Sequence, residues 1–437
     1  MKLSKLRVLP LLLAPILAGC PGASEDPRPN ILLITIDTLR ADHIGLYGYA
    51  RPTTPRLDAF FGEASIFENA MSTSPCTRPS VRQYLSGSFF AKPGGRHLAE
   101  HLLAAGYQTA AVVSQHQFYE RLNEDYTPGF LSFDIQRQDE VDRFGLSTRS
   151  AVDISDRALR WLGGRDPAQP YFLWLHYFDP HDPYEPPAAF RSFDRGNTST
   201  LSGDRRGYQT AASKSSDQPW FSKGEIFSEA DVAHFVNLYD GEIRYVDEQI
   251  GRIFDWLDEQ GHVDDTIVVL TADHGEMLGE GGYWDHCFSL GEPEIRAPLL
   301  LRVEGGRLGD LGRTQLAAST IDLLPTILGR LQIGFEASDY QGADLAIADP
   351  NRTVIAVWKQ SSAIRSRSFK LHHDRKEPTA LYRIAADPGE QRSLLTQEAG
   401  AASSLLQALR AHKLLLSKVG RETEEAARRL KALGYIQ

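Results

Sequence analysis

The sequence has no long run of basic residues and no internal repeat. Its 57 acidic side chains outnumber its 47 lysines and arginines, which gives a net charge of −10. Nucleic-acid binding needs clustered cations that neutralise phosphates, so this composition argues against a nucleic-acid partner. Beyond residue 20 the chain also lacks any apolar segment long enough to span a bilayer. What is present is ordinary globular composition, in a chain long enough for one large core and a smaller subdomain.

Cysteine is scarce too, and the first of the three cysteines closes an export signal. Three basic residues precede the apolar stretch 8–17, which is too short to cross a membrane. The Leu-Ala-Gly-Cys that ends this signal resembles a bacterial lipobox, which implies cleavage before Cys20 and lipidation of that cysteine. The alternative is an ordinary secretory signal with an incidental Cys20. We therefore expect residues 1–19 to be a lipoprotein signal peptide and 20–28 a tether. The protein would then be anchored by lipid in the bacterial cell envelope, on the periplasmic side or at the cell surface.

Short apolar runs alternate with helical patterns over most of the chain. The runs that predict buried strands are ILLITI (31–36), TAAVV (109–113), YFLWL (171–175), TIVVL (266–270) and PLLLRV (298–303). Apolar residues recur at three- and four-residue steps over 229–260, which predicts a long helix that Gly261 would cap. Strands that alternate with helices predict an α/β fold with a mostly parallel sheet sandwiched by helices.

Two stretches depart from this pattern. Residues 191–228 are rich in Ser, Gly, Asp and Arg and are interpreted as a surface insertion, with a substrate lid as the alternative. The later runs that predict a small antiparallel sheet are TVIAVW (353–358), FKLHH (369–373) and ALYRI (380–384). Residues 395–433 predict a helical tail, with Leu405, Leu406, Leu409 and Leu414 to Leu416 available for docking. We therefore expect a catalytic domain at 29–334 and a C-terminal subdomain with its tail at 335–437.

Acidic and imidazole side chains follow four of the predicted strands, where each strand ends. In an open α/β sheet, ligands bind beyond the carboxyl ends of the strands. The residues at these positions are Asp37, Ser114, Gln115, His116, His176, Asp179, His181, Asp273 and His274, with His286 further along the last loop. Each alone has a structural explanation, but together they predict one clustered site. Aspartate and histidine ligands suit a divalent ion such as calcium, zinc or manganese.

The stretch SPCTRPSVRQYLSG (74–87) adds a hydroxyl group to this inventory. It predicts a short helix with Pro79 in its first turn and Gly87 past its end, so that Thr77 leads into the helix. The positive end of a helix dipole favours an anionic substrate. A threonine hydroxyl is a weak nucleophile unless a metal lowers its pKa. The alternative is that Thr77 only caps the helix.

Four stretches carry a resemblance to a known family: PNILLITIDTLRADHIGLYGY (29–49), the 74–87 stretch, YFDPHDPY (177–184) and TADHGEMLGE (271–280). They resemble the sulfatase family of the alkaline phosphatase superfamily. The resemblance implies the alkaline-phosphatase-like fold and a divalent metal held by Asp37, Asp273 and His274, with the nucleophile as fourth protein ligand. It also implies that His181 and His286 contact the transferred group or help to protonate the leaving oxygen. His116 falls at the histidine of the family's Gly-Lys-Trp-His stretch.

Four positions depart from the family's pattern, and the first is the nucleophile. Sulfatases place a cysteine two residues before a Pro-Ser pair and convert it to formylglycine, but here that position holds Thr77 and not Cys76. Val81 replaces the arginine after the pair, Thr38 replaces the second aspartate of an Asp-Asp pair, and Ser114 stands where a lysine is expected. We therefore expect no formylglycine, and Thr77 as both nucleophile and metal ligand.

A threonine nucleophile changes the expected chemistry. A formylglycine hydrate expels sulfate by collapsing to the aldehyde, whereas a threonine ester is cleared by attack at the central atom, which phosphorus accepts readily. Thr77 and the GEMLGEGGYWDH stretch are also similar to phosphoethanolamine transferases and phosphodiesterases of the same superfamily. In those relatives further histidines can bind a second zinc, and His176, His181 and His286 are candidates here.

The sequence thus predicts hydrolysis or transfer of phosphate esters or related anionic esters of a glycan, a lipid headgroup or a small molecule. The alternatives are a sulfuric ester hydrolase and an inactive lipoprotein that binds an anionic ligand. The two remaining cysteines, Cys76 and Cys287, adjoin Thr77 and His286 and could pair in an exported protein; two unpaired thiols are the alternative.

Overall fold

The computed structural model describes residues 28–90, 95–114, 126–135, 148–199, 201, 227–375 and 377–432, with side chains described up to residue 417. Cys20, His116 and most of the predicted insertion lie outside these ranges, so what was expected of them stays a prediction. Among the helices of the described ranges, none combines the length and the apolar character needed to cross a bilayer.

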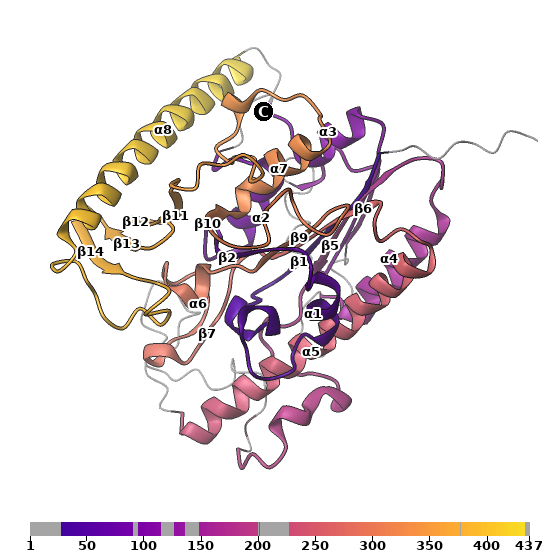
Figure 1. Ribbon diagram of the computed structural model, residues 1–437, viewed down its shortest axis with the longest axis horizontal. Helices are drawn as coiled ribbons and strands as arrows, with labels where there is room; N and C mark the ends of the chain where they lie inside the picture. The colour runs from indigo at the N-terminus through magenta and orange to yellow at the C-terminus, as the bar shows by residue number, and fades with distance from the viewer. Residues whose placement is uncertain are drawn as a thin grey trace, which may run out of the picture.

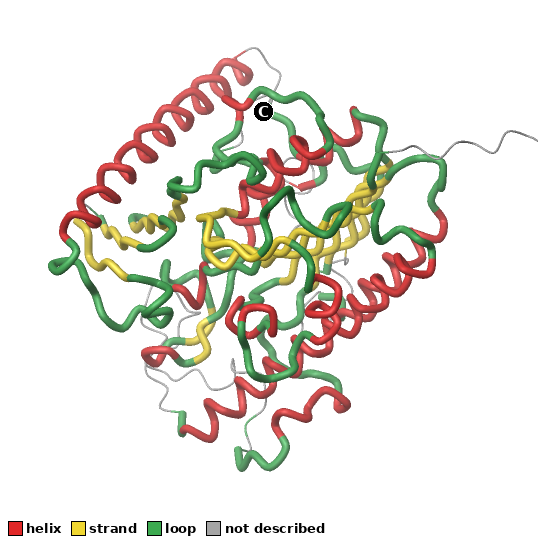
Figure 2. The backbone as a smooth tube through the Cα atoms, viewed as in Figure 1, coloured by secondary structure: helices red, strands yellow, loops and turns green. Residues whose placement is uncertain are grey.

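An eight-stranded sheet runs through the centre of the protein (Figures 1 and 2), in the order β10-β2-β9-β6-β1-β5-β3-β4. Its strands are β1 (Asn30–Ile36), β2 (Ser65–Met71), β3 (Gln108–Val113), β4 (Ser132–Ile135), β5 (Tyr171–Tyr177), β6 (Thr266–Ala272), β9 (Leu299–Arg302) and β10 (Arg313–Ser319). Neighbouring strands are parallel except where β9 runs antiparallel to β2 and β6. The predicted mostly parallel sheet is confirmed.

Helices cover both faces of this sheet because successive strand residues point to opposite sides. Leu32 and Ile34 of β1 share a core with α1 (Pro55–Phe61), α4 (Ala151–Gly164) and α5 (Glu229–Glu259). Ile31 and Leu33 share a second core with α2 (Thr77–Ser86), α3 (Leu98–Ala104) and α7 (Leu323–Arg330). Figure 1 shows the two sets of helices on opposite sides of the sheet, which makes a three-layered α/β fold.

A second, antiparallel sheet of four strands lies under the C-terminal helix. Its strands, in spatial order, are β11 (Val354–Trp358), β12 (Ser361–Arg365), β13 (Lys370–Asp374) and β14 (Glu377–Tyr382), and α8 (Ala399–Ala432) packs across them (Figure 1). Leu405 and Leu409 are buried against this sheet as expected. The expectation was wrong for Leu414 and Leu415, which are 68% and 49% exposed. The buried positions recur at three- and four-residue steps; Leu414 falls on the opposite side of the helix, and Leu415 lies at the margin of the buried face, where it lines a small cavity with Leu416 and Ile355.

The small sheet meets the large sheet through an apolar junction and a group of buried charges. The junction contains Met71, Leu290, Ile295, Ala317, Val354, Ala356 and Ala363. Beside it, the Glu292 carboxylate contacts Arg365 and lies 2.7 Å from Lys370, which also lies 3.0 Å from Glu390. Two carboxylates and two cations therefore compensate one another in the interior. The backbone of Val357 also donates to the Thr73 carbonyl at 3.0 Å, so the small sheet reaches the loop that leads to α2.

Candidate active site

Four polar side chains meet where β1 and β6 end and α2 begins. Asp37 follows β1, Asp273 and His274 follow β6, and these two strands are hydrogen-bonded neighbours. Thr77 is the first residue of α2. The ligand atoms of Asp37, Asp273 and His274 all lie within 4.8 Å of one another, and the three side chains are fully buried. The structure thus brings together the residues that the sequence suggested as metal ligands.

The imidazole of His274 is oriented as a metal ligand would be. Its Nδ1 lies 2.9 Å from the Gly275 carbonyl, so this nitrogen donates its hydrogen and Nε2 keeps its lone pair. Nε2 lies 3.0 Å from Thr77 Oγ1, 3.4 Å from Asp273 Oδ2 and 3.6 Å from Asp37 Oδ1. Burial lowers the pKa of His274 to about 4, so the ring is neutral at physiological pH. A neutral histidine fixed by a hydrogen bond at its other nitrogen is the form that coordinates a metal ion.

The two carboxylate oxygens of Asp273 have different surroundings: one accepts backbone hydrogen bonds, and the other faces the cluster of Asp37, Asp273 and His274. Oδ1 accepts the backbone N–H of His274 at 2.8 Å and that of Thr38 at 3.3 Å. Oδ2 is buried and has no hydrogen-bond donor among the described residues. Two buried carboxylates beside a neutral imidazole carry negative charge that a divalent cation would compensate. Oxygen ligands with one imidazole fit calcium, zinc or manganese, so these residues fit the expected metal.

The helix that carries Thr77 begins earlier than the sequence suggested. Cys76, and not Thr77, is the N-cap residue of α2, and Thr77 Oγ1 lies against His274 instead of capping the helix. Two serines that were not predicted to contact the site fix this helix to the loop of Asp273. Ser80 donates to the Asp273 carbonyl at 2.6 Å, and Ser72 contacts the same oxygen. Thr77 is therefore held against the cluster by contacts that also fix the loop of Asp273.

His286 and His181 border this cluster. The His286 ring centroid lies 4.4 Å from that of His274 and 5.0 Å from that of His181. Nδ1 of His286 lies 3.0 Å from Asp285 and 3.3 Å from Glu276. Burial lowers the pKa of His286, but the two carboxylates raise it, and the result lies well above its ordinary value. Burial, together with the nearby His286, lowers the pKa of His181 to about 4. The site therefore places a protonated imidazole beside a neutral one.

His176, the third histidine considered for a second metal, lies deeper in the sheet. Its Nδ1 is 2.8 Å from the Thr35 hydroxyl, and burial lowers its pKa to about 4.

Glu276 and Asp285, which the sequence analysis missed, form a second group of close ligand atoms with His286. A short hairpin, β7 (Met277–Leu278) with β8 (Trp284–Asp285), brings them together. The only signal was their position beside His274 and His286 in the chain.

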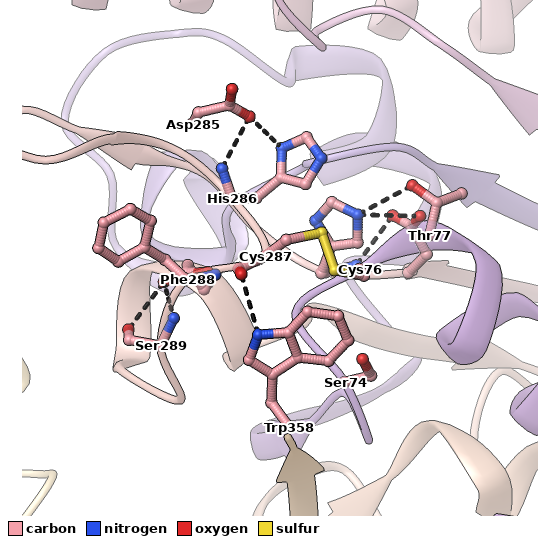
Figure 3. The surroundings of a disulfide bond; sticks show 12 residues. Ser74, Cys76, Thr77, Asp285, His286, Cys287, Phe288, Ser289 and Trp358 are labelled. Atoms are coloured by element: carbon pink, nitrogen blue, oxygen red, sulfur yellow. Dashed lines mark hydrogen bonds and ion pairs between the residues drawn. A yellow bond between two sulfur atoms is a disulfide. The ribbon is translucent and has the colours of Figure 1, made fainter. Parts of the chain in front are cut away.

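A disulfide joins Cys76 to Cys287, so the pairing that the sequence left open is formed. Figure 3 shows the bond between the segment that carries Thr77 and the segment that carries His286. The backbone N–H of Cys287 also donates to the Pro75 carbonyl at 3.0 Å. The nucleophile loop and the histidine loop are thus tied together beside the cluster.

Residues 29–333 match the family model described as Sulfatase, which is more than half of the chain. This chain belongs to the sulfatase family. It is therefore an ester hydrolase of the alkaline phosphatase superfamily. The N-acetylglucosamine-6-O-sulfatase of Bacteroides thetaiotaomicron is 25% identical over an alignment that covers 86% of this chain and 85% of that protein. The arylsulfatase of Clostridium perfringens is 26% identical, with 69% and 74% covered.

Solved structures show the same fold. A protein in complex with its substrate, D-glucosamine-2-N,6-O-disulfate, has a TM-score of 0.70 at 22% identity, covering 90% of this chain and 98% of that one. The phosphonate monoester hydrolase of Agrobacterium radiobacter has a TM-score of 0.63 at 19% identity, with 90% and 96% covered. The alkaline-phosphatase-like architecture expected from the sequence is confirmed.

Proposed function

We propose that this sulfatase-family protein is a metal-dependent hydrolase or transferase of phosphate esters or related anionic esters, with Thr77 as its nucleophile. One observation carries the proposal. The Thr77 hydroxyl lies 3.0 Å from His274 Nε2 at the carboxylate cluster, whereas the sulfur of Cys76 is bonded to Cys287. A cysteine in a disulfide has no free thiol from which formylglycine could be made. The threonine is therefore the only one of the two adjacent side chains that presents a free group to the cluster.

Asp37, Asp273, His274 and Thr77 are the residues that would hold the metal. A divalent cation bound there would lower the pKa of the nucleophilic hydroxyl and polarise the ester. The position of Thr77 at the start of α2, a helix of 10 residues, adds the positive end of a helix dipole where the anionic group of a substrate would lie. His286 engages two carboxylates through Nδ1, which leaves Nε2 as the ring atom for contact with a substrate.

We propose a two-step reaction for this placement. The Thr77 hydroxyl gives up its proton to water and Oγ forms a bond to phosphorus, while the bond to the leaving oxygen breaks and that oxygen takes up a proton. Water or a second alcohol then attacks the phosphorus of the threonine ester, the bond from phosphorus to Oγ breaks, and the proton that the attacking group loses balances the one that restores the Thr77 hydroxyl. His286 and His181 border the position of the transferred group and are the residues we propose to contact it or to deliver the proton.

Hydrolysis of sulfuric esters is the second candidate, and the relatives favour it. The curated relatives include the N-acetylglucosamine-6-O-sulfatase, the arylsulfatase and a choline-sulfatase of Rhizobium meliloti. In favour of phosphorus chemistry, the solved structures of similar fold include a phosphonate monoester hydrolase. A sulfated glucosamine is the substrate in one structural neighbour, which supports an anionic ester of a glycan as a substrate class for this chain. An inactive ligand-binding role is less well supported because the carboxylates, His274 and Thr77 are assembled at one site.

The lipid anchor and the envelope location stay proposals that rest on the Leu-Ala-Gly-Cys signal alone. Mass spectrometry of the mature N-terminus tests them. A diacylated Cys20 as the first residue is expected. A mature chain that begins elsewhere, or that carries an unmodified cysteine, would contradict the anchor.

Activity on three substrate classes tests the proposed reaction. Protein reconstituted separately with zinc, manganese and calcium is assayed on an aryl sulfate, a phosphate monoester and a phosphodiester, with Thr77→Ala in parallel. We expect turnover of a phosphoester that Thr77→Ala abolishes. Turnover of the aryl sulfate alone, with an aldehyde detected at residue 76, would overturn the threonine mechanism in favour of a formylglycine sulfatase.

A further inference from the structure

The loop that carries His286 is fastened to the rest of the protein immediately after that histidine. Cys287 is bonded to Cys76, and its backbone N–H donates to Pro75 at 3.0 Å. Its carbonyl accepts the indole N–H of Trp358 at 2.9 Å, a residue of the small C-terminal sheet (Figure 3). Every polar group of the Cys287 backbone is therefore engaged, and the sulfur makes the one covalent bond.

The next two residues are held by a single buried carboxylate. Glu294, in the short helix α6 (Glu292–Ile295), accepts the backbone N–H of Phe288 at 2.8 Å and that of Ser289 at 2.7 Å. Its own carbonyl accepts the N–H of Gly275 at 2.7 Å, next to His274. These contacts hold the distal part of the loop, whereas its His286 end is tied to the start of α2 by the disulfide and by the hydrogen bond from Cys287 to Pro75.

The disulfide joins the immediate neighbours of two proposed reacting groups. Cys76 precedes Thr77, Cys287 follows His286, and 211 residues separate the two cysteines in the chain. The carboxylates of the metal site come instead from the ends of β1 and β6, which hydrogen bonds of the central sheet hold together. The bond therefore constrains the nucleophile relative to His286 without holding the carboxylate ligands.

We propose that the Cys76–Cys287 disulfide is a positioning element of the active site, which sets Thr77 and His286 against the same substrate. The proposal rests on the proposed function for the roles of these two residues. Breaking the bond leaves the metal carboxylates in place, but it removes the covalent constraint between the His286 loop and α2, so that only hydrogen bonds such as that from Cys287 to Pro75 limit their relative movement. Misplacement of a reacting group by about 1 Å can cost up to about 100-fold in rate. Reduction should therefore lower kcat between about tenfold and 100-fold, with little change in KM and in bound metal.

Reduction with tris(2-carboxyethyl)phosphine tests the proposal on the full-length, metal-loaded protein. The phosphine bonds to one sulfur, the S–S bond breaks, and water supplies the oxygen of the phosphine oxide as both cysteines become thiols. Thiols are counted in denatured samples, metal content is measured, and kcat and KM are determined before and after treatment. The control is the Cys76→Ser/Cys287→Ser double variant, treated in the same way.

We expect two additional thiols on reduction, a lower kcat, unchanged metal content, and recovery of kcat when the disulfide is re-formed by oxidised glutathione. The double variant should match the reduced protein and should not respond to the phosphine. If it does not fold, the reversible reduction of the natural protein decides alone. A fully reduced protein that keeps its kcat would overturn the proposal. Substantial activity in Thr77→Ala would overturn the proposed function instead, whatever the response to reduction.

Discussion

The substitution Asp273→Asn should change the stability of the protein in opposite directions with and without metal. Asparagine has nearly the same shape, and its Oδ1 can keep the backbone hydrogen bonds from His274 and Thr38. What it removes is one of two buried negative charges whose ligand atoms lie within 4.8 Å of each other. At an effective dielectric constant of about 20, two unit charges at that separation repel by about 3 kcal/mol.

In metal-free protein, the variant should therefore be more stable than the natural protein by up to about 3 kcal/mol. With metal at 1,000 times the Kd of the natural protein, the order should reverse, because a cation that binds only the folded state then stabilises it by about 4.1 kcal/mol, which exceeds the advantage of the variant. The variant has lost a charged ligand and would gain less from the same metal concentration.

Urea unfolding in the presence of a chelator, and then with zinc, manganese or calcium, measures both effects without relying on activity. Asp310→Asn, at an exposed aspartate, is the matched control and should leave stability unchanged in both conditions. If Asp273→Asn is no more stable than the natural protein under chelation, and no metal favours the natural protein, the cluster is not a metal site.

Two further substitutions test other parts of the site. Thr77→Ala should lower kcat at least about 1,000-fold and cost about 1 kcal/mol of stability, because one hydrogen bond is lost. Thr77→Ser keeps the hydroxyl and should keep most of the activity. Equal losses of kcat in both variants would argue against a nucleophilic hydroxyl. Burial raises the pKa of Glu294 from 4.5 to about 7, so between these values the folded protein binds a proton that the unfolded chain has released. The free energy of unfolding of the natural protein, relative to that of Glu294→Gln, should therefore fall by up to about 3 kcal/mol as the pH rises from 4.5 to about 7. Urea midpoints of the two proteins that differ by the same amount at every pH would contradict this prediction.

The core strands of the sheet could be predicted because their sequences are apolar throughout. Four strands of the two larger sheets were missed, namely β2, β4, β10 and β12, because their sequences mix polar and apolar residues. In β2, Glu68 pairs with Arg313 at 2.7 Å, and Asn69 donates to the Arg367 carbonyl at 3.0 Å. These polar side chains are satisfied by partners about 245 and 298 residues away, as the contacts of Glu68 and Asn69 show. No local pattern can carry that information.

The candidate site also contains residues that a local pattern predicts and residues that depend on distant contacts. Asp37, Asp273 and His274 could be anticipated because each directly follows a buried strand, and strand ends meet at one edge of a parallel sheet. Glu276 and Asp285 could not, because a tight hairpin brings them to His286 with Asp285 at a φ of 80°. The role of Trp358 was also invisible, since it depends on how the small sheet docks on the loop after His286.

The most direct test of the threonine mechanism is to trap the covalent intermediate. Metal-loaded protein is mixed with a phosphoester substrate, quenched in acid, digested, and the peptide that spans residues 74–87 is analysed by mass spectrometry, with Thr77→Ala as control. Phosphorylation of Thr77 in the natural protein, together with an unmodified Cys76 recovered from its disulfide, is the expected result. A formylglycine at residue 76, or turnover of the substrate with the adduct on a residue other than Thr77, would contradict it.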